Sequence, residues 1–345
     1  MHDGEGAIAQ NIVGLRFNHL ICHPKYAYYL LTDPTNRARV KNLDISSVQP
    51  SVKVPHLLAL EFDLPGISDQ KAIAHILGTL DDKIELNRKM NETLEEIAKA
   101  IFRSWFVDFD PVRAKMEGRP TGLPDDIAAL FPDRLVDSEI GQIPERWEAE
   151  PLSAFLFDAG KRTKPSRETE SNPYVPIDCI EPRSMTLYNF KDGSEAKSSL
   201  IAFNEKDILF GAMRPYFHKV CIAPFHGTTR STCLVLNSRA PHYYSFAFLT
   251  LFADSTIEFA TQNSTGSTIP YIKWDNELAT MKVAFPGESL ATVFNEAILP
   301  IFAKIKCSAN ENKVLSELRD TLLPKLISGE LQVPDAEKFL KEASI

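Results

Sequence analysis

Two stretches of this chain repeat one long pattern of apolar residues, and this repeat limits the possible folds more than any other feature. In residues 68–106, apolar side chains recur every three or four positions from Ile73 to Trp105. The same spacing recurs from Phe294 to Leu326. Such spacing places the apolar side chains on one face of a helix. We therefore predict two long amphipathic helices, over residues 68–106 and about 288–327, with a soft interruption of the second at Pro300.

The two predicted helices match each other at a single offset of 221 residues. The matched positions are Ile84 and Ile305, Asn91 and Asn312, Leu94 and Leu315, Ile97 and Leu318, and Ile101 and Leu322. Solenoid repeats have periods of about 20 to 50 residues, so this longer period indicates one duplicated unit, a globular piece followed by a helix.

Each apolar stripe needs a partner, and each helix offers one to the other. We expect two antiparallel helices that pack as a coiled-coil-like spacer. At about 1.5 Å per residue, each would span on the order of 55 to 60 Å. The predicted helix-pairing side chains are Ile84, Leu94, Ile97, Ile101, Ile305, Leu315, Leu318 and Leu322.

Four segments follow from this division. Residues 1–66 hold short apolar runs and one aromatic stretch, typical of the latter part of an α/β domain. Residues 67–150 comprise the first helix and an ordered strap rich in Pro, Gly and aromatic anchors, and residues 288–345 are helical. Between them, residues 151–287 form a globular domain of mixed α/β class, with strands predicted over 174–177, 207–210, 219–223, 232–236 and 281–285 and a helix over 243–260.

Composition excludes several classes of protein. No apolar run approaches the roughly 18 to 20 residues of a membrane span, and the first ten residues do not resemble a signal peptide, so we expect a cytoplasmic protein without membrane contact. The five cysteines form no CxxC pair, which favours buried thiols over a zinc site. The net charge of −8 argues against indiscriminate coating of nucleic acid, although residues 151–287, with 14 Lys and Arg against 13 Asp and Glu, leave room for a local basic face.

The motifs of DNA-modifying enzymes are missing from the sequence. A methyltransferase loop of the (D/N)PP(Y/F) type would need one more proline than Asn172-Pro173-Tyr174 offers, and no P-loop occurs. Asp108 and Asp110 are more simply read as a polar cap at the helix end than as a nuclease site. The carboxylates of the first helix, among them Glu95, are expected on a solvated or partner-facing side. We therefore predict no catalytic residue, no metal site and no cofactor.

Contacts to DNA have better candidates, although each has an ordinary structural explanation as well. Lys161, Arg162, Lys164 and Arg167 place four cations in seven residues, suited to phosphates, but could form a plain solvated loop.

A second set lies in the predicted turn of residues 211–219, where Arg214, Tyr216 and Lys219 could reach a duplex. An arginine can bind guanine through two hydrogen bonds, yet Arg214 could equally form a buried ion pair. Loops rich in short donors add Arg230, Ser267 and Thr268, which turn chemistry explains almost as well.

Three segments carry a family resemblance. LGTLDDKIELNRKMNETLEEIAKAIFRSWFVDFDPVRAKMEG, with LFPD and VDSEIGQIPERWE after it, resembles the central conserved region of the specificity subunit of type I restriction-modification systems. LRDTLLPKLISGEL resembles the distal conserved region, and DILFGAMRPYFHKV resembles a strand-turn-strand of the target-recognition domains.

This resemblance implies two target-recognition domains, each reading half of a split site in double-stranded DNA, held apart by the conserved helices. Those helices would dock methyltransferase (modification) subunits, which recruit the endonuclease/translocase subunit, and S-adenosylmethionine, ATP and Mg²⁺ would belong to these partners. Residues 1–66 then correspond to a C-terminal remnant of a first recognition domain. Self-pairing of partial subunits is therefore a further possibility, as is a truncated scaffold that pairs with other subunits without full bipartite recognition.

Overall fold

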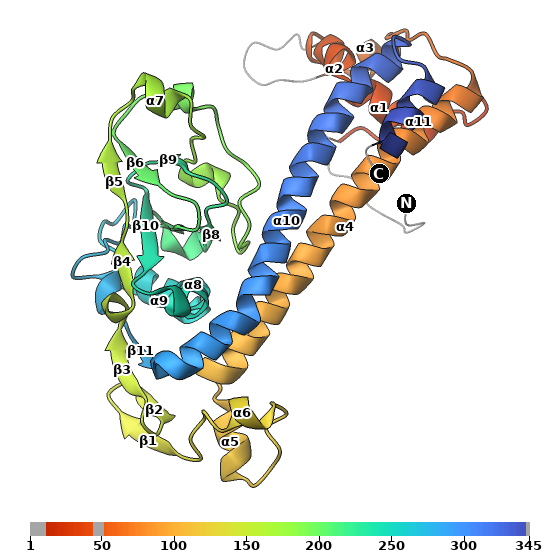
Figure 1. Ribbon diagram of the computed structural model, residues 1–345. Coiled ribbons are helices and arrows are strands. Elements are labelled where there is room, and N and C mark those ends of the chain that lie inside the picture. The colour runs from red at the N-terminus through yellow and green to blue at the C-terminus, as the bar shows by residue number, and fades with distance from the viewer. Residues whose placement is uncertain (1–11, 44–51, 343–345) are drawn as a thin grey trace. The chain divides into compact units, whose positions relative to one another are not determined.

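The computed structural model describes residues 12–43 and 52–342, which belong to two compact units. One unit comprises Met1–Asn87 together with Glu311–Ile345, and the other comprises Arg88–Asn310. Each unit contains a part of both long helices, α4 (Ile67–Phe106) and α10 (Gly287–Ser328), which are labelled in Figure 1. The apolar stripes of α4 and α10 can therefore pack against each other within each unit.

The ends of the two long helices agree with the predicted ends to within one residue. Pro65 and Gly66 precede α4, and at its other end the N–H groups of Val107 and Asp108 both donate to the Arg103 carbonyl oxygen. Gly329 follows α10 with φ +76°, the left-handed conformation in which helices commonly terminate.

The interruption predicted at Pro300 is wrong, because α10 continues through this residue. A proline inside a helix lacks one N–H donor, which normally weakens the ladder. Pro300 is exposed, whereas Ile298 and Phe302 on either side of it are buried. Packing of these neighbours holds the helix together across the missing hydrogen bond.

The unit formed by the two chain ends contains, among its described residues, four short helices besides residues 67–87 of α4 and 311–328 of α10. These are α1 (Pro24–Thr32), α2 (Pro34–Lys41), α3 (Val54–Leu58) and α11 (Val333–Glu342). Tyr26 and Tyr29 of α1 are buried with Leu77, Leu80 and Leu315 in one core cluster. The described part of residues 12–66 contains helices and no strand, so this segment differs from the α/β pattern predicted for it.

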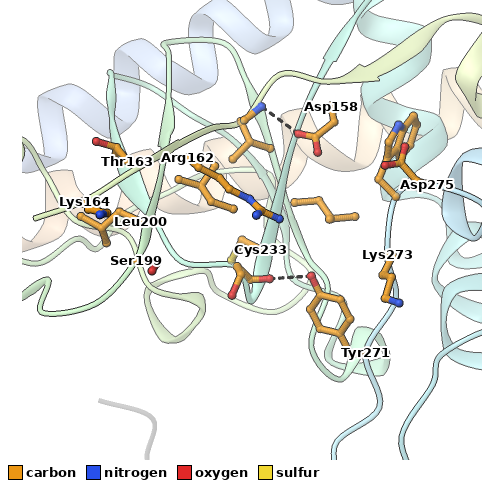
Figure 2. Close-up of a pocket in the computed structure, with 16 residues that line it drawn as sticks. Asp158, Arg162, Thr163, Lys164, Ser199, Leu200, Cys233, Tyr271, Lys273 and Asp275 are labelled. Atoms are coloured by element: carbon orange, nitrogen blue, oxygen red, sulfur yellow. Dashed lines mark hydrogen bonds between the residues drawn. The ribbon is translucent and has the colours of Figure 1, made fainter.

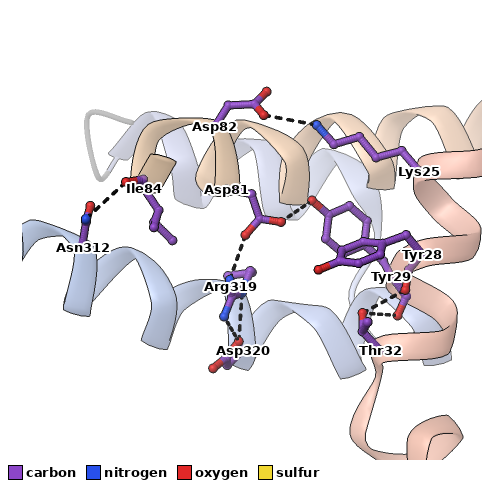
Figure 3. Close-up of polar contacts among 10 residues, drawn as sticks. All are labelled: Lys25, Tyr28, Tyr29, Thr32, Asp81, Asp82, Ile84, Asn312, Arg319 and Asp320. Atoms are coloured by element: carbon purple, nitrogen blue, oxygen red, sulfur yellow. Dashed lines mark hydrogen bonds and ion pairs between the residues drawn. The ribbon is translucent and has the colours of Figure 1, made fainter. Parts of the chain in front are cut away.

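A polar network joins three helices of this unit (Figure 3). The Tyr29 hydroxyl donates to one Asp81 oxygen at 2.6 Å, and Arg319 donates to the other at 2.8 Å. Asn312 donates to the Ile84 carbonyl oxygen at 3.2 Å. Since 81 faces 319 and 84 faces 312, α4 and α10 run antiparallel here.

The unit of Arg88–Asn310 contains antiparallel sheets (Figure 1). The larger has the order β4-β10-β7-β8 and a second has the order β5-β6-β9, while β3 pairs with β11 and β1 with β2. The strands are β1 (Leu135–Ser138), β2 (Gly141–Pro144), β3 (Glu148–Pro151), β4 (Leu156–Asp158), β5 (Lys161–Thr163), β6 (Leu200–Phe203), β7 (Ile208–Gly211), β8 (Val220–Ile222), β9 (Gly227–Thr229), β10 (Cys233–Ser238) and β11 (Lys282–Phe285).

Five short helices of this unit lie outside the long helices among the described residues. They are α5 (Asp110–Met116), α6 (Asp125–Ala128), α7 (Arg167–Glu170), α8 (Tyr244–Phe252) and α9 (Asp254–Gln262). The single helix predicted over 243–260 is two helices, because Ala253 between them adopts an extended ψ of 143°. The strand predicted over 174–177 is absent: Tyr174 forms only isolated bridges, and a 3₁₀ turn begins at Ile177.

Aromatic side chains from distant segments build the core of this unit. Phe106 of α4 lies 4.7 Å from Phe294 of α10 and 5.0 Å from Phe246 of α8, measured between ring centroids. Trp105 and Trp147 are buried as well, as are the strap residues Phe109 and Phe131. The strap therefore packs on the end of α4 through its aromatic anchors.

The predicted helix-pairing residues differ in burial. Ile84, Ile305, Leu315 and Leu322 are buried, and Leu94, Ile101 and Leu318 are half-buried against the core clusters. Ile97 is 43% exposed, so its predicted pairing is wrong. In the unit of Arg88–Asn310, the buried face of α4 instead follows Asn91, Glu95, Ala98 and Phe102. An apolar pattern could not identify this face, because two of these four residues are polar.

These buried polar residues have partners. Asn91 donates to the Ile305 carbonyl oxygen at 3.2 Å, and the corresponding bond at the offset of 221 joins Asn312 to Ile84. The duplicated sequence therefore makes the same side chain to backbone contact twice, once in each unit. A buried asparagine in a helix pair fixes its register.

Candidate nucleic-acid interface

A cavity of about 650 Å³ in the unit of Arg88–Asn310 brings two predicted DNA-binding residues, Arg162 and Lys164, together with residues that the sequence analysis missed (Figure 2). Its lining side chains come from β4, β5, β6, β10 and the segment 271–275. Polar lining residues include Asp158, Arg162, Thr163, Lys164, Ser231, Tyr271, Lys273 and Asp275, and Leu200, Ile201, Leu234, Val235 and Trp274 add an apolar part. The cavity lining thus contains both cationic and acidic side chains.

Local geometry explains why strand β5 borders this cavity. The Asp158 carboxylate accepts a hydrogen bond from the Gly160 N–H at 2.9 Å, which closes the turn between β4 and β5. A Cβ atom on Gly160 would lie 2.7 Å from the Ile201 side chain, so only glycine fits here. The tight turn directs β5 back along β6, where Arg162 pairs in register with Ile201.

The four clustered cations are all exposed, but they do not form one group. Arg162 and Lys164 line the cavity, and Lys161 and Arg167 do not. Arg167 begins α7, whose N-cap Ser166 and Thr169 form a reciprocal capping box. The structure therefore divides the cluster into two cations at the cavity and two outside its lining.

The turn of residues 214–218 connects β7 to β8. Arg214 and His218, at its two ends, have φ of 53° and 52°. Tyr216 is 49% exposed at the centre of the turn. Lys219 is half-buried, and its ammonium donates to the Ile177 carbonyl oxygen at 2.9 Å, which gives it a structural partner. Arg214 forms no ion pair among the described residues, and its Nε is buried without a hydrogen-bond partner.

Hydrogen bonds join this turn to the donor-rich loop that follows α9. Thr265 and Tyr271 exchange two backbone hydrogen bonds of 2.9 Å and close a hairpin whose tip contains the exposed Ser267 and Thr268. The Arg214 N–H donates to the Pro270 carbonyl oxygen at 2.8 Å. Tyr271 in turn donates through its hydroxyl to the Ser231 carbonyl oxygen at 2.8 Å, next to the exposed Arg230.

Hydrogen bonds therefore link three separate loops that the sequence suggested independently, and Ser231 and Tyr271 of these loops line the cavity. Tyr271, Lys273 and Asp275 were missed. The signal that could have indicated them is the run Tyr271-Ile272-Lys273-Trp274-Asp275, where polar-tipped and apolar residues alternate directly after the donor-rich loop.

Glu95 is a buried titratable group of α4 that contacts the loop of residues 185–186. It is 6% exposed and its hydrogen-bond partners belong to the same chain, so its expected place on a solvated or partner-facing helix side is wrong. Its carboxylate accepts hydrogen bonds from the Met185 N–H and the Thr186 hydroxyl, both at 3.1 Å. Burial raises the pKa of Glu95 to about 7, against the lowering effect of these two hydrogen bonds and of Lys99.

His218 is a second buried titratable group. Its Nε2 lies 2.9 Å from the Phe252 carbonyl oxygen, which ties the turn to the end of α8. Burial and the nearby Arg183 lower the pKa of His218, so the neutral ring is favoured.

Within residues 12–43 and 52–342, no group of three or more His, Cys, Asp or Glu side chains is arranged to hold a metal ion. No helix in the same ranges has both the length and the apolar character needed to cross a membrane. Asp108, considered above as part of a nuclease site, is paired with Arg103 at 2.8 Å.

Comparisons with known proteins point to one class. The model of the type I restriction modification DNA specificity domain family matches residues 2–96. Over 326 residues the chain is 29% identical to the type I restriction enzyme MjaIX specificity subunit of Methanocaldococcus jannaschii, covering 90% of this chain and 70% of that one. The HindI specificity subunit of Haemophilus influenzae is 25% identical over 366 residues, which is 91% of this chain and 79% of the relative.

Among solved structures, the S subunit of a type I restriction-modification system from M. genitalium aligns with 90% of this chain and 74% of its own, at a TM-score of 0.49 and 15% identity. The sequence comparisons confirm the resemblance found in the sequence: this chain is related to the specificity subunits of type I restriction-modification systems.

Proposed function

We propose that this chain is the non-catalytic subunit that gives a type I restriction-modification complex its DNA sequence specificity. The observation that carries the proposal is the similarity to curated specificity subunits over nine-tenths of the chain. In this proposal residues 151–287 form the target-recognition domain that reads a site or half-site. S-adenosylmethionine, ATP and Mg²⁺ would be bound by other subunits.

The geometry of the candidate interface suits this task. Arg162 and Lys164 are exposed beside the cavity and can contact phosphates, which positions a domain without reading sequence. Arg214, Arg230 and the hydroxyls of Ser267 and Thr268 lie on loops joined by hydrogen bonds and can approach base edges. Phosphate contacts and base contacts would therefore come from different elements of one domain.

Docking of methyltransferase subunits through the long helices is the second part of the proposal. On α4, Ile97 and Ala100 are exposed at a spacing of three residues, which puts them on one face, and the exposed Val107 directly follows the helix. Apolar side chains that the core leaves uncovered on a long helix suit packing against a helix of another protein. The endonuclease/translocase subunit would then join through the complex.

The two parts of the proposal are tested separately. Capture of the cognate methyltransferase subunit by the purified chain tests docking, and we expect Ile97→Glu to abolish capture whereas Ile140→Glu, at an exposed apolar residue outside α4, preserves it. Recovery of the partner by both variants would contradict the assignment of this face.

For DNA, the complex is incubated with randomised duplexes and the bound fraction is sequenced. Enrichment of a defined sequence is the expected result. A bound fraction as random as the input would show that the chain supplies no specificity and acts as a scaffold.

A further inference from the structure

Two adjacent aromatic rings project from the turn of residues 214–218 and have no packing partner sufficient to bury them. Tyr216 is 49% exposed and Phe217 is 46% exposed. Their ring centroids are 4.8 Å apart, at an interplanar angle of 54°. Large apolar side chains that are exposed together at the tip of a turn suggest a surface that contacts another molecule.

The backbone beneath these rings is constrained. Arg214 and His218 are both left-handed although neither is glycine, a conformation that persists only where the surroundings enforce it. Between them Pro215 is buried with a fixed φ, and the Phe217 and His218 N–H groups donate back within the turn. Strain of this kind is concentrated at functional sites, and here it holds two rings outward on a rigid base.

Contacts at both ends attach the turn to the domain. The His218 ring is hydrogen-bonded to the Phe252 carbonyl oxygen, and α9 packs against the turn. At the other end, the Arg214 N–H bonds to Pro270 of the donor-rich hairpin, where Ile269 is 51% exposed. An apolar tip is thus placed next to the loop that carries Ser267 and Thr268.

The charges beside the tip favour a polyanion over an apolar protein surface. Arg214 belongs to the turn itself and has no ion-pair partner among the described residues. Asp254, the carboxylate near His218, is paired with Arg183 at 3.0 Å, which offsets its charge. Rings flanked by a cation and hydroxyl donors match the groups that proteins use to wedge open a base step.

We propose that Tyr216 and Phe217 form a wedge that partly unstacks one base step of the bound duplex, an inference that rests on the proposed function. The cost of unstacking depends on the step, and pyrimidine–purine steps deform most easily. The wedge would therefore contribute sequence preference through deformability, without a hydrogen bond to any base. It adds Phe217, which the sequence analysis did not select, to the residues that determine specificity.

The test uses the duplex that the wild-type complex selects, with 2-aminopurine placed at successive positions of the site. Unstacking raises the fluorescence of this base, so we expect one step to brighten when the complex binds. The double variant Tyr216→Ala, Phe217→Ala should lose this signal and bind the duplex at least about fivefold more weakly, since stacking of a base on an aromatic ring contributes this much or more.

Two controls separate the wedge from general damage. Tyr216→Phe with Phe217→Tyr keeps both rings and should retain signal and affinity, and Phe157→Ala removes a ring that is 36% exposed elsewhere in the domain. Equal melting temperatures establish that the variants fold.

Selective binding by the double-alanine variant at wild-type affinity, or fluorescence unchanged at every step, would overturn the wedge while leaving the proposed function intact. Failure of the wild type to select any duplex would overturn both. Loss of partner-subunit capture with unchanged DNA binding would show a protein-docking turn and also overturn the wedge.

Discussion

Replacing Glu95 by glutamine should remove a pH dependence from the stability of the unit of Arg88–Asn310. The carboxylate is buried and accepts hydrogen bonds from Met185 and Thr186. Glutamine has nearly the same shape, and its side-chain oxygen can accept the same two bonds. The substitution Glu95→Gln therefore removes the titration while keeping the contacts that join α4 to the loop of residues 185–186.

The sign and size of this pH dependence follow from the pKa of Glu95. The pKa of Glu95 rises from 4.5 to about 7 on folding, so between these values the folded state holds a proton that the unfolded state has released. The free energy of unfolding of the wild type then falls as pH rises, by about 1.4 kcal/mol per pH unit. Over the whole interval the loss amounts to about 3 kcal/mol, and it is complete above pH 7.

Urea unfolding followed by tryptophan fluorescence measures this effect. All three tryptophans, Trp105, Trp147 and Trp274, belong to the same unit as Glu95, so their signal reports on that unit. The difference in unfolding free energy between wild type and Glu95→Gln should change by about 3 kcal/mol from pH 4.5 to pH 7.5, with the wild type relatively weaker at the higher pH.

A matched control is Glu96→Gln, which alters the exposed neighbouring carboxylate without touching Met185 or Thr186. This variant should follow the wild-type pH dependence. A difference between wild type and Glu95→Gln that stays constant across this pH range would refute the reasoning, because it would mean that the buried carboxyl does not take up its proton on folding.

Three further predictions concern the interface and the two cores. Arg162→Ala with Lys164→Ala should weaken DNA binding to all sequences and reduce the slope of log affinity against log salt by about two, measured by titration at several salt concentrations; an unchanged slope would exclude phosphate contacts by this pair. Phe294→Ala should cost about 3 to 5 kcal/mol of unfolding free energy, because the ring is fully buried between Phe106 and Trp105, whereas a loss below 1 kcal/mol would contradict the core packing. Asp81→Asn should cost about 1 to 3 kcal/mol, since Tyr29 and Arg319 both donate to the partly buried carboxylate; a variant as stable as wild type in urea would show that the network contributes nothing.

The sequence allowed the long helices to be predicted almost to the residue, because pattern and end signals agree there. Three- and four-residue spacing continues through each helix, and Gly66 and Gly329 fall at the boundaries. The packing face could be predicted less well. An apolar stripe leads from Ile84 toward Ile97, whereas the structure turns Asn91 and Glu95 inward. Hydrogen bonds to Ile305 and Met185 compensate their burial, and such partners lie too far away in sequence to be foreseen.

The candidate interface shows the same limit. Clustered cations and donor-rich loops identified Arg162, Arg214 and Ser267 one segment at a time. The loops that carry Arg214, Arg230 and Ser267 are linked by the Arg214–Pro270 and Tyr271–Ser231 hydrogen bonds, which form only once the sheets are assembled. The exposure of Phe217 likewise depends on left-handed residues at both ends of its turn, a conformation that is uncommon for residues other than glycine.

The central claim is that residues 151–287 determine which DNA sequence the complex selects. The most direct test replaces this segment by the aligned segment of the M. jannaschii relative and compares the duplexes selected from a random pool by the parent and by the chimera, each assembled with the same partner subunits. The proposal predicts that the two proteins enrich different sequences, with equal capture of the partner. Enrichment of the same sequence by both would contradict it and place the recognition outside this domain.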